Sequence, residues 1–298
     1  MRVISVPAVL EARTVDQLLG GVGGVDEGKA LLDARHLRWV DPQGMLALLA
    51  AGKVLAQRTG EIPVLHLPPQ GDAAGYLGRM GFFQAAEGVL AVEGAPARRS
   101  SGGGSDVLLE ITPISTNGDI HSLVDRVQSR AGSILSNTLD YPPSAVVQFS
   151  VILSEVCQNI LEHAEAPGWV AAQAYNWKKR LGRHVLVIGV SDLGRGFRGS
   201  LGADQAARFG DRWADSTALE AAFLHGITRF PDSGRGQGIQ QIRKQVRRWE
   251  GSISIRSGTA RIADVPPWDD TPPMEEGLPS FPGSQIHIVL PQRVPDVG

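Results

Sequence analysis

The sequence predicts a protein of combined α/β and α+β class. A small α/β unit comes first, and a larger unit with helices on one face of a mixed sheet follows. Strand-like and helix-like stretches alternate through residues 1–97, which is typical of an α/β unit with a parallel-containing sheet. After residue 106, long helical patterns and apolar strands replace this alternation, which is typical of an α+β unit.

The composition is that of a globular chain with a sizeable core. Of the 298 residues, 42% are hydrophobic and 20% are charged. The net charge of −2 argues against a protein that binds nucleic acid over its whole surface. The single cysteine, Cys157, excludes a disulfide within the chain and a cysteine-rich zinc site. No long apolar run or signal-peptide pattern is present, so we expect a cytoplasmic protein with no membrane or nucleic-acid partner.

The first unit, residues 1–97, is expected to alternate strands with helices. Strands are predicted at 31–37 and 61–67, and helices at 43–57 and 75–83. Residues 98–106 (RRSSGGGSD) contain only small, polar and charged side chains, and they are expected to form a flexible linker to the second unit, 107–298.

The second unit is expected to combine long helices with apolar strands. Strands are predicted at 107–112, 169–177, 184–191, 252–257 and 285–290. Helices are predicted at 119–139, 144–164, 216–225 and 238–249. Residues 263–283 are rich in proline and acidic side chains and are expected to form a loop.

Two glycine-rich motifs resemble nucleotide loops but lack parts of them. Residues 23–30 have the spacing of a P-loop, but Ala30 stands where a hydroxyl is needed, so we interpret them as a surface turn. Residues 194–199 have the spacing of a dinucleotide-binding loop, but the glycine-interrupted residues after them do not predict the helix that such a site requires. Neither a zinc-protease nor a hydrolase-elbow motif is present.

A polar stripe is predicted on the helix at 144–164. Glu155, Asn159 and His163 follow each other at intervals of four residues, and each interval turns a helix by about 40°. Asparagine has mediocre helix propensity, so it is an unusual choice for a merely solvated face. The spacing alone leaves both a functional stripe and a solvated face open.

Two further segments carry chemistry. Asp192 ends an apolar strand and is followed by Gly194 and Gly196, so its carboxylate could accept a hydrogen bond from an exocyclic amine beside closely approaching backbone. Residues 234–238 (GRGQG) lead into a predicted helix, whose free N–H groups form an anion site. An ordinary β-turn and a flexible helix start are the alternatives.

Together, the three segments resemble the boxes of the GHKL ATP-binding fold, shared by gyrase-type ATPases, heat-shock chaperones, mismatch-repair ATPases, histidine kinases and anti-sigma-factor serine kinases. Residues 155–163 resemble the N box, and 192–196 and 234–238 resemble the two glycine boxes. Residues 283–291 resemble the closing strand. The resemblance covers roughly residues 107–298.

The resemblance implies an ATP and Mg²⁺ site. Asn159 would bind Mg²⁺, Asp192 would bind the adenine amine, and Glu155 would be the general base. Near them, the resemblance puts Gly194, Gly196 and Ser284 at the adenine, and Arg235, Gly236, Gly238 and His163 at the phosphates, with residues 197–237 as a lid.

The first unit resembles the STAS fold of anti-sigma-factor antagonists, over roughly residues 1–95. The resemblance rests on residues 31–46, where a strand leads to an aspartate and then to a helix. Pro42 and Gln43 stand where the family carries its phosphoacceptor. We therefore expect a module that docks or regulates and is not phosphorylated in the usual way.

The expected function is that of a Mg-ATP-binding regulatory protein. Residues 154–164 (SEVCQNILEHA) look most like the anti-sigma-factor serine kinases, which implies an ATPase or a protein serine/threonine kinase. The implied partner is a regulatory protein, STAS-like or sigma-factor-like, with a second copy of the chain as a further candidate. A catalytically silent nucleotide-binding module and an ATP-gated dimeric clamp remain alternatives. The surroundings of His121 do not resemble a phosphoacceptor histidine.

Overall fold

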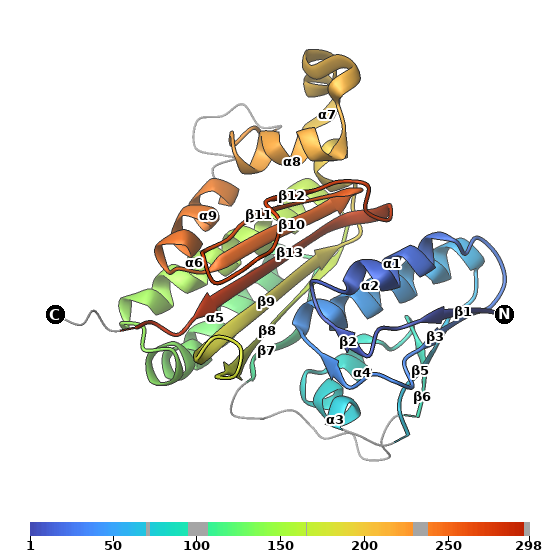
Figure 1. Ribbon diagram of the computed structural model, residues 1–298, viewed down its shortest axis with the longest axis horizontal. Coiled ribbons are helices and arrows are strands. Elements are labelled where there is room, and N and C mark those ends of the chain that lie inside the picture. Colours follow the sequence, from blue (N-terminus) through green and yellow to red (C-terminus); the bar gives the residue numbers. More distant parts are fainter. Residues whose placement is uncertain (70–71, 95–106, 165, 229–237, 295–298) are drawn as a thin grey trace.

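Two sheets organise the chain, and they lie side by side in the computed structural model of Figure 1. The structure describes residues 1–69, 72–94, 107–164, 166–228 and 238–294. Of residues 131–133, 163 and 203–204 it describes the backbone only. The predicted linker, 98–106, lies outside the described residues.

Residues 2–93 form a four-stranded sheet in the order β1-β3-β5-β6, and each of its pairings is parallel. The strands are β1 (Arg2–Ser5), β3 (Ala30–Asp33), β5 (Val64–His66) and β6 (Ala91–Glu93). Helices connect them, as parallel strands require: α1 (Val15–Gly23), α2 (Pro42–Thr59), α3 (Asp72–Arg79) and α4 (Phe82–Ala85). The short strands β2 (Val9–Leu10) and β4 (Trp39–Val40) pair separately.

Helix α2 is the longest helix of this unit, and the residues at its ends fix its length. The Asp41 carboxylate accepts the N–H of Gly44 at 2.7 Å and caps the first turn. Pro42 occupies the first turn, where its missing N–H has no cost. Gly60 ends the helix with a φ of 72°.

Residues 107–291 form a seven-stranded sheet in the order β12-β11-β10-β13-β9-β8-β7. Its strands are β7 (Val107–Ile114), β8 (Gly168–Trp177), β9 (Arg183–Asp192), β10 (Ser252–Gly258), β11 (Ala260–Asp264), β12 (Met274–Glu275) and β13 (Phe281–Pro291). All pairings described in it are antiparallel, so the expectation of a mixed sheet is wrong. Two helices connect β7 to β8. They bring the chain back to the end of the sheet where β7 finished, so β8 runs antiparallel to β7, whereas a single crossover helix would give a parallel pair.

The helices of this unit lie on one face of the sheet and at one of its ends (Figure 1). They are α5 (Asn117–Ser133), α6 (Ser144–Asn159), α7 (Gly196–Phe209), α8 (Asp215–Phe223) and α9 (Gly238–Arg248), with the short turns η1 (Ile134–Thr138), η2 (Ile160–Ala164) and η3 (Gly210–Arg212). Helix α7 was not predicted, because glycines interrupt its sequence and Gly202 kinks it. Strand β12 lies within the stretch expected to be a loop.

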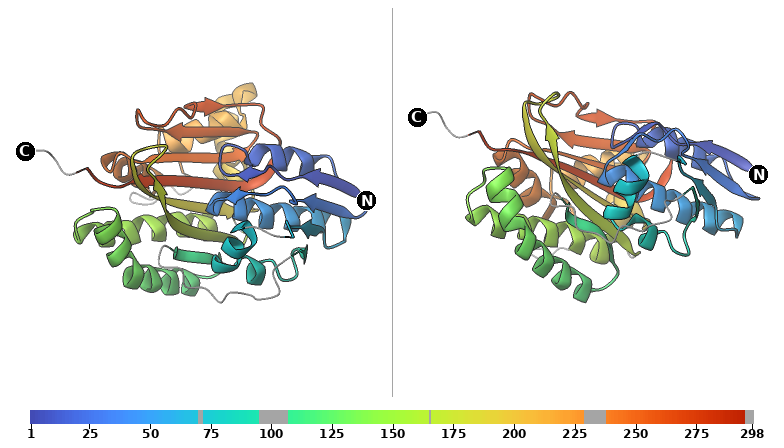
Figure 2. Two further views of the ribbon diagram at one scale, coloured as in Figure 1. Left: turned by 60° about the horizontal axis from the view of Figure 1, so that its bottom comes forward. Right: turned by 90° about the horizontal axis from the view of Figure 1, so that it is seen from below.

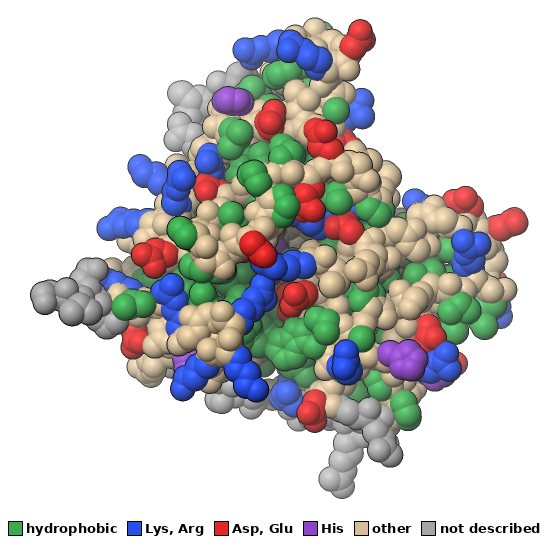
Figure 3. All heavy atoms as spheres, viewed as in Figure 1, with side chains coloured by type: hydrophobic (Ala, Val, Ile, Leu, Met, Phe, Trp, Pro, Cys, Tyr) green, Lys and Arg blue, Asp and Glu red, His purple; other side chains and the backbone are tan. Residues whose placement is uncertain are grey.

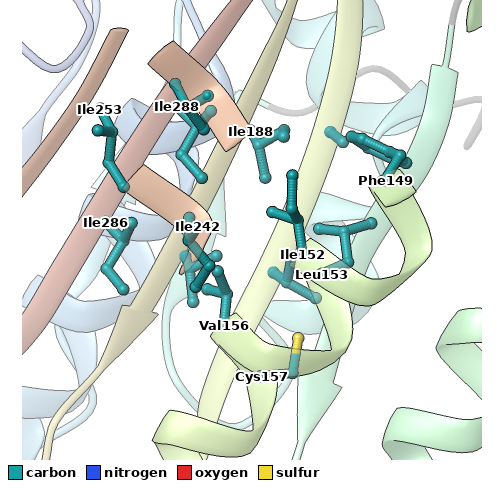
Figure 4. Close-up of a cluster of buried hydrophobic side chains, with 14 of the residues drawn as sticks. Phe149, Ile152, Leu153, Val156, Cys157, Ile188, Ile242, Ile253, Ile286 and Ile288 are labelled. Carbon is teal, nitrogen blue, oxygen red and sulfur yellow. The ribbon is translucent and has the colours of Figure 1, made fainter. Parts of the chain in front are cut away.

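One face of the seven-stranded sheet is apolar and forms the core with these helices. Figure 4 shows Ile188 of β9, Ile288 of β13 and Ile253 of β10 near Ile152 and Val156 of α6. All five side chains are buried. Burial of this kind of surface is the main stabilising contribution to a fold.

One helical stretch, Ser144–Glu162, has the length and apolar composition that could cross a membrane. Its mean hydropathy is 1.3, and 44% of it is buried inside the structure. Helix α6, which makes up most of it, packs against the sheet, α5 and α9, so these apolar residues serve the core.

The N-terminal unit packs against part of the other face of the seven-stranded sheet (Figure 2). Helix α2 lies against β8 and β9. Val107, Ile111, Trp169, Ala171 and Phe281 of the larger sheet belong to the hydrophobic core of the N-terminal unit. The two units are therefore packed together, and the sheet has a different neighbour on each face.

Candidate functional site

A cavity of about 230 Å³ lies between α6, α7, α8, α9 and the ends of β9 and β13. It opens on the helical side of the sheet. Six predicted site residues from four separate sequence segments line it: Glu155, Asn159, Asp192, Gly196, Gly238 and Ser284.

The other predicted site residues either do not line the cavity or lie outside the described residues. Gly194 does not line the cavity, but its N–H holds the Asp192 carboxylate. Arg235, Gly236 and the side chain of His163 lie outside the described residues. Within the lid predicted at 197–237, the described part contains α7 and α8.

Asp192 ends β9 with a buried carboxylate. Its Oδ1 accepts the N–H of Gly194 at 2.8 Å and the N–H of Ser284 at 3.2 Å. Burial raises the pKa of Asp192 to about 6, although these two hydrogen bonds oppose the shift. Because both bonds use Oδ1, Oδ2 is the oxygen available to a ligand in the cavity.

The turn after Asp192 depends on two glycines. A Cβ at Gly194 would overlap the carbonyl of Ala164, so no other residue fits at this approach. Gly196 begins α7 with a φ of 66°, in the left-handed region that favours glycine. Residues 194–199 thus do open a helix, against the expectation, but β9 belongs to an antiparallel sheet and not to a dinucleotide-binding unit.

Ser257 of β10 ties this turn to β13. Its Oγ accepts the N–H of Phe197 at 3.0 Å and donates to the carbonyl of Gly283 at 3.1 Å. The same serine therefore positions the start of α7 and the strand that carries Ser284. Sequence reasoning missed it, since a serine inside a strand has no distinguishing pattern.

Glu155 lies beside the start of α9. A Cβ at Gly238 would lie 2.7 Å from Oε2 of Glu155, so the glycine leaves room for the carboxylate. The N–H groups of the first turn of a helix have no partners within the helix and attract negative charge. This end of the cavity can therefore hold an anionic group.

Asn159 brings an unsatisfied amide to the cavity. Its Nδ2 is buried and has no hydrogen-bond partner among the described residues. The amide oxygen is a hard ligand of the kind that Mg²⁺ accepts. No group of three or more His, Cys, Asp or Glu side chains that could hold a metal ion occurs in the described part of the chain. A metal here would therefore need oxygens from its ligand as well as from Asn159.

Apolar walls that the sequence reasoning did not identify complete the cavity. They come from Val190, Phe197, Leu201, Ile239 and Ile286. Val190 and Ile286 could have been found by alternation, because each stands two positions from a predicted site residue on its strand. The two walls contributed by α7 could not, since that helix was not predicted.

The motif at 23–30 has the environment of a turn. Helix α1 ends at Gly23, so these residues follow a helix, whereas a P-loop precedes one. In comparisons with known proteins, no family model and no curated protein matches this chain.

Ser257→Ala should lower the free energy of unfolding by about 1–3 kcal/mol, because two buried hydrogen-bonding groups lose their partner. Ser191→Ala is the matched control. Ser191 is also buried in a strand, but its Oγ has no partner among the described residues. Urea unfolding followed by circular dichroism should show a loss for Ser257→Ala and none for Ser191→Ala. Equal effects would contradict the positioning role of Ser257.

Proposed function

We propose that this chain is a Mg-ATP-binding regulatory protein of the GHKL superfamily with a STAS-like N-terminal unit. It acts as an ATPase or as a protein serine/threonine kinase on a regulatory partner protein. One observation carries the proposal: residues taken from four separate sequence boxes line a single cavity. If the four motifs resembled the family boxes only by chance, there would be no reason for their residues to meet at one cavity.

The adenine end of the site follows from Asp192. Oδ1 is held by two backbone N–H groups, which leaves Oδ2 to accept a hydrogen bond from an exocyclic amine. The apolar side chains of Val190 and Ile286 beside it suit a flat ring. Their combination with one fixed polar group is typical of a selective small-molecule site.

The phosphate end follows from Asn159, Glu155 and the start of α9. Asn159 would hold Mg²⁺ through its amide oxygen, and a bound Mg²⁺ neutralises phosphate charge. Glu155 would take the proton of the attacking water or hydroxyl as that oxygen bonds to the γ-phosphorus and the bond to the β-phosphate oxygen breaks. The free N–H groups of α9 suit phosphate oxygens.

The acceptor is water or a hydroxyl of a partner. Gln43, at the position of the STAS phosphoacceptor, is buried against Gly189 of β9, on the face opposite the cavity. This arrangement does not support transfer of the γ-phosphoryl group to the chain's own N-terminal unit. The STAS-like unit is therefore a regulatory module, and the substrate protein is a separate one.

The fate of the γ-phosphate tests the reaction. With labelled ATP and Mg²⁺, Glu155→Ala should slow release of free phosphate by about 10²–10⁴-fold, because the general base is lost. Glu220→Ala, which removes an exposed carboxylate of α8 away from the cavity, is the control. Label that stays on bound ATP in wild type and variant alike would favour the silent nucleotide-binding module. Dimerisation only with Mg-ATP would favour the clamp.

Asp192→Asn should weaken binding of a non-hydrolysable ATP analogue by about 10–100-fold. The two backbone N–H groups keep the amide oxygen at the Oδ1 position, so the NH₂ group faces the adenine amine donor to donor. Asp125→Asn, at an exposed position of α5, is the control in calorimetric titrations. Unchanged affinity for Asp192→Asn would refute the adenine assignment.

Binding should also depend on pH through Asp192. Its raised pKa of about 6 means that the carboxylate is ionised at pH 7 and mostly protonated at pH 5. Only the ionised form accepts the amine hydrogen bond at Oδ2, so affinity should fall about tenfold from pH 7 to pH 5. The same titration with Asp192→Asn separates this effect from protonation of the phosphates. An identical pH slope in both proteins would contradict the role of Asp192.

A further inference from the structure

The two faces of the seven-stranded sheet differ in chemistry. The face toward α5, α6 and α9 carries aliphatic side chains, as Figure 4 shows. The face toward the N-terminal unit is partly polar, and alternate positions on its strands include Ser191, Gln285, His287, Arg256 and Gln173.

Polar groups in this interface are incompletely satisfied. Eight buried side-chain atoms in the described residues have no hydrogen-bond partner, and six of them lie at this interface. They belong to Gln43 (both amide atoms), Gln173, Ser191, Gln285 and His287. No protein group among the described residues hydrogen-bonds these atoms, and bulk water would do so on separation of the two surfaces. Apolar side chains of the sheet, including Trp169 and Phe281, lie beside these polar groups, so the interface is mixed in composition, as interfaces between domains of one chain commonly are.

Ion pairs across the interface give it a specific register. Asp16 of α1 accepts a 2.6 Å hydrogen bond from Nε of Arg256, and its other oxygen pairs with Arg261. Both arginines are buried on the sheet. At the margin, Arg13 pairs with Asp269 at 3.0 Å. Figure 3 shows acidic and basic side chains gathered along this boundary, in the middle of the view.

The residues around Asp192 pack onto the N-terminal unit. Leu193, the next residue, contacts its hydrophobic core, as do Trp169 and Phe281. Trp169 adjoins Gly168, the strand partner of Asp192. Phe281 begins the strand whose Ser284 N–H holds the Asp192 carboxylate. Three side chains near the Asp192 carboxylate along the chain or the sheet therefore pack against the N-terminal unit.

A second connection runs through β10 to α8. Arg256, held by Asp16, also donates to the carbonyl of Gly258 at 3.3 Å. The next residue, Thr259, donates its N–H and its hydroxyl to Oδ2 of Asp215, at 2.8 and 2.9 Å. Asp215 begins α8, and Ala222 of α8 lines the cavity.

We propose that the polar face of this sheet is a reversible docking surface for the N-terminal unit, residues 1–94, and that docking holds the nucleotide cavity in its binding geometry. Docking and nucleotide binding then strengthen each other by the same factor, because linkage is reciprocal. The inference rests on the proposed function, since it concerns the same cavity.

A substitution at Gly189 tests the docking surface directly. A Cβ there would lie 2.9 Å from the backbone nitrogen of Gln43 and 3.1 Å from its Cα. Valine suits a strand, so Gly189→Val should wedge α2 away from the sheet while leaving β9 intact. Gly23→Val, at a glycine with open space around it, is the matched control.

Asp16→Asn tests the same interface from the other side, so the proposal does not depend on the folding of one variant. It removes the charge that faces Arg256 and Arg261 and leaves the sheet unchanged. Asp26→Asn, at an exposed position of the same unit, is its control.

The measurements are the radius of gyration of the full chain by small-angle X-ray scattering and the Kd of Mg²⁺ with a non-hydrolysable ATP analogue. In both test variants the radius of gyration should increase and the Kd should rise about 5–50-fold. Saturating analogue should return Asp16→Asn toward the wild-type radius. The controls should match wild type in both measurements.

Three outcomes would overturn the inference in distinguishable ways. A larger radius with wild-type Kd would refute the coupling while leaving the nucleotide site standing. A wild-type radius in both test variants would refute the docking surface. A wild-type chain that binds no analogue would refute the proposed function itself, and the coupling with it.

Discussion

The buried carboxylate of Asp192 is the constraint on which the rest of the site depends. Taking a carboxylate out of water costs free energy, and here hydrogen bonds from two backbone N–H groups offset part of that cost. One of them requires the chain to turn at once after β9, which only a glycine at 194 permits. The other requires β13 to lie beside β9 in one register, with Gln285 opposite Ser191. Both the antiparallel pairing of β9 with β13 and the glycine turn are therefore needed to hold the Asp192 carboxylate at the end of β9.

The period of two along a strand lets the same strands serve two neighbours. On β9, Ile188 and Val190 face the helices, while Gly189 and Ser191 face the N-terminal unit. The apolar face cannot separate from α6 without exposing the core. The opposite face also buries apolar side chains, such as Trp169 and Phe281, but Ser191, Gln285 and Arg256 on it have favourable alternatives in water. One sheet thus combines a permanent interface with a surface suited to recognition.

Local patterns predicted much of this fold and of the site. The apolar runs of β8 and β9 and the helix at 144–164 are strong signals. Spacing alone leaves a solvated face open for Glu155 and Asn159, and the resemblance to the GHKL boxes is what singles them out together with Asp192. Helix α7 was missed because Gly199 and Gly202 lower local propensity, and packing of Phe197 and Leu201 overrides it. Strand direction was missed because it depends on how distant segments connect. The alternation of Gln285 and His287 with isoleucines on β13 is visible in the sequence, but what covers the face of Gln285 and His287 is a long-range property.

A partly polar interface is sufficient for docking when both partners belong to one chain. Covalent connection converts docking into an intramolecular step, which raises the effective concentration of each partner. Asp16 selects the register of docking by pairing with Arg256 and Arg261. Leu193, Trp169 and Phe281 then make their apolar contacts with the N-terminal unit in that register. Adjacent residues 191 and 192 point to opposite faces, so a displacement of this strand end moves the docking surface and the adenine-binding carboxylate together. A more apolar interface would hold the units more tightly, but it would leave no second state for a nucleotide to select.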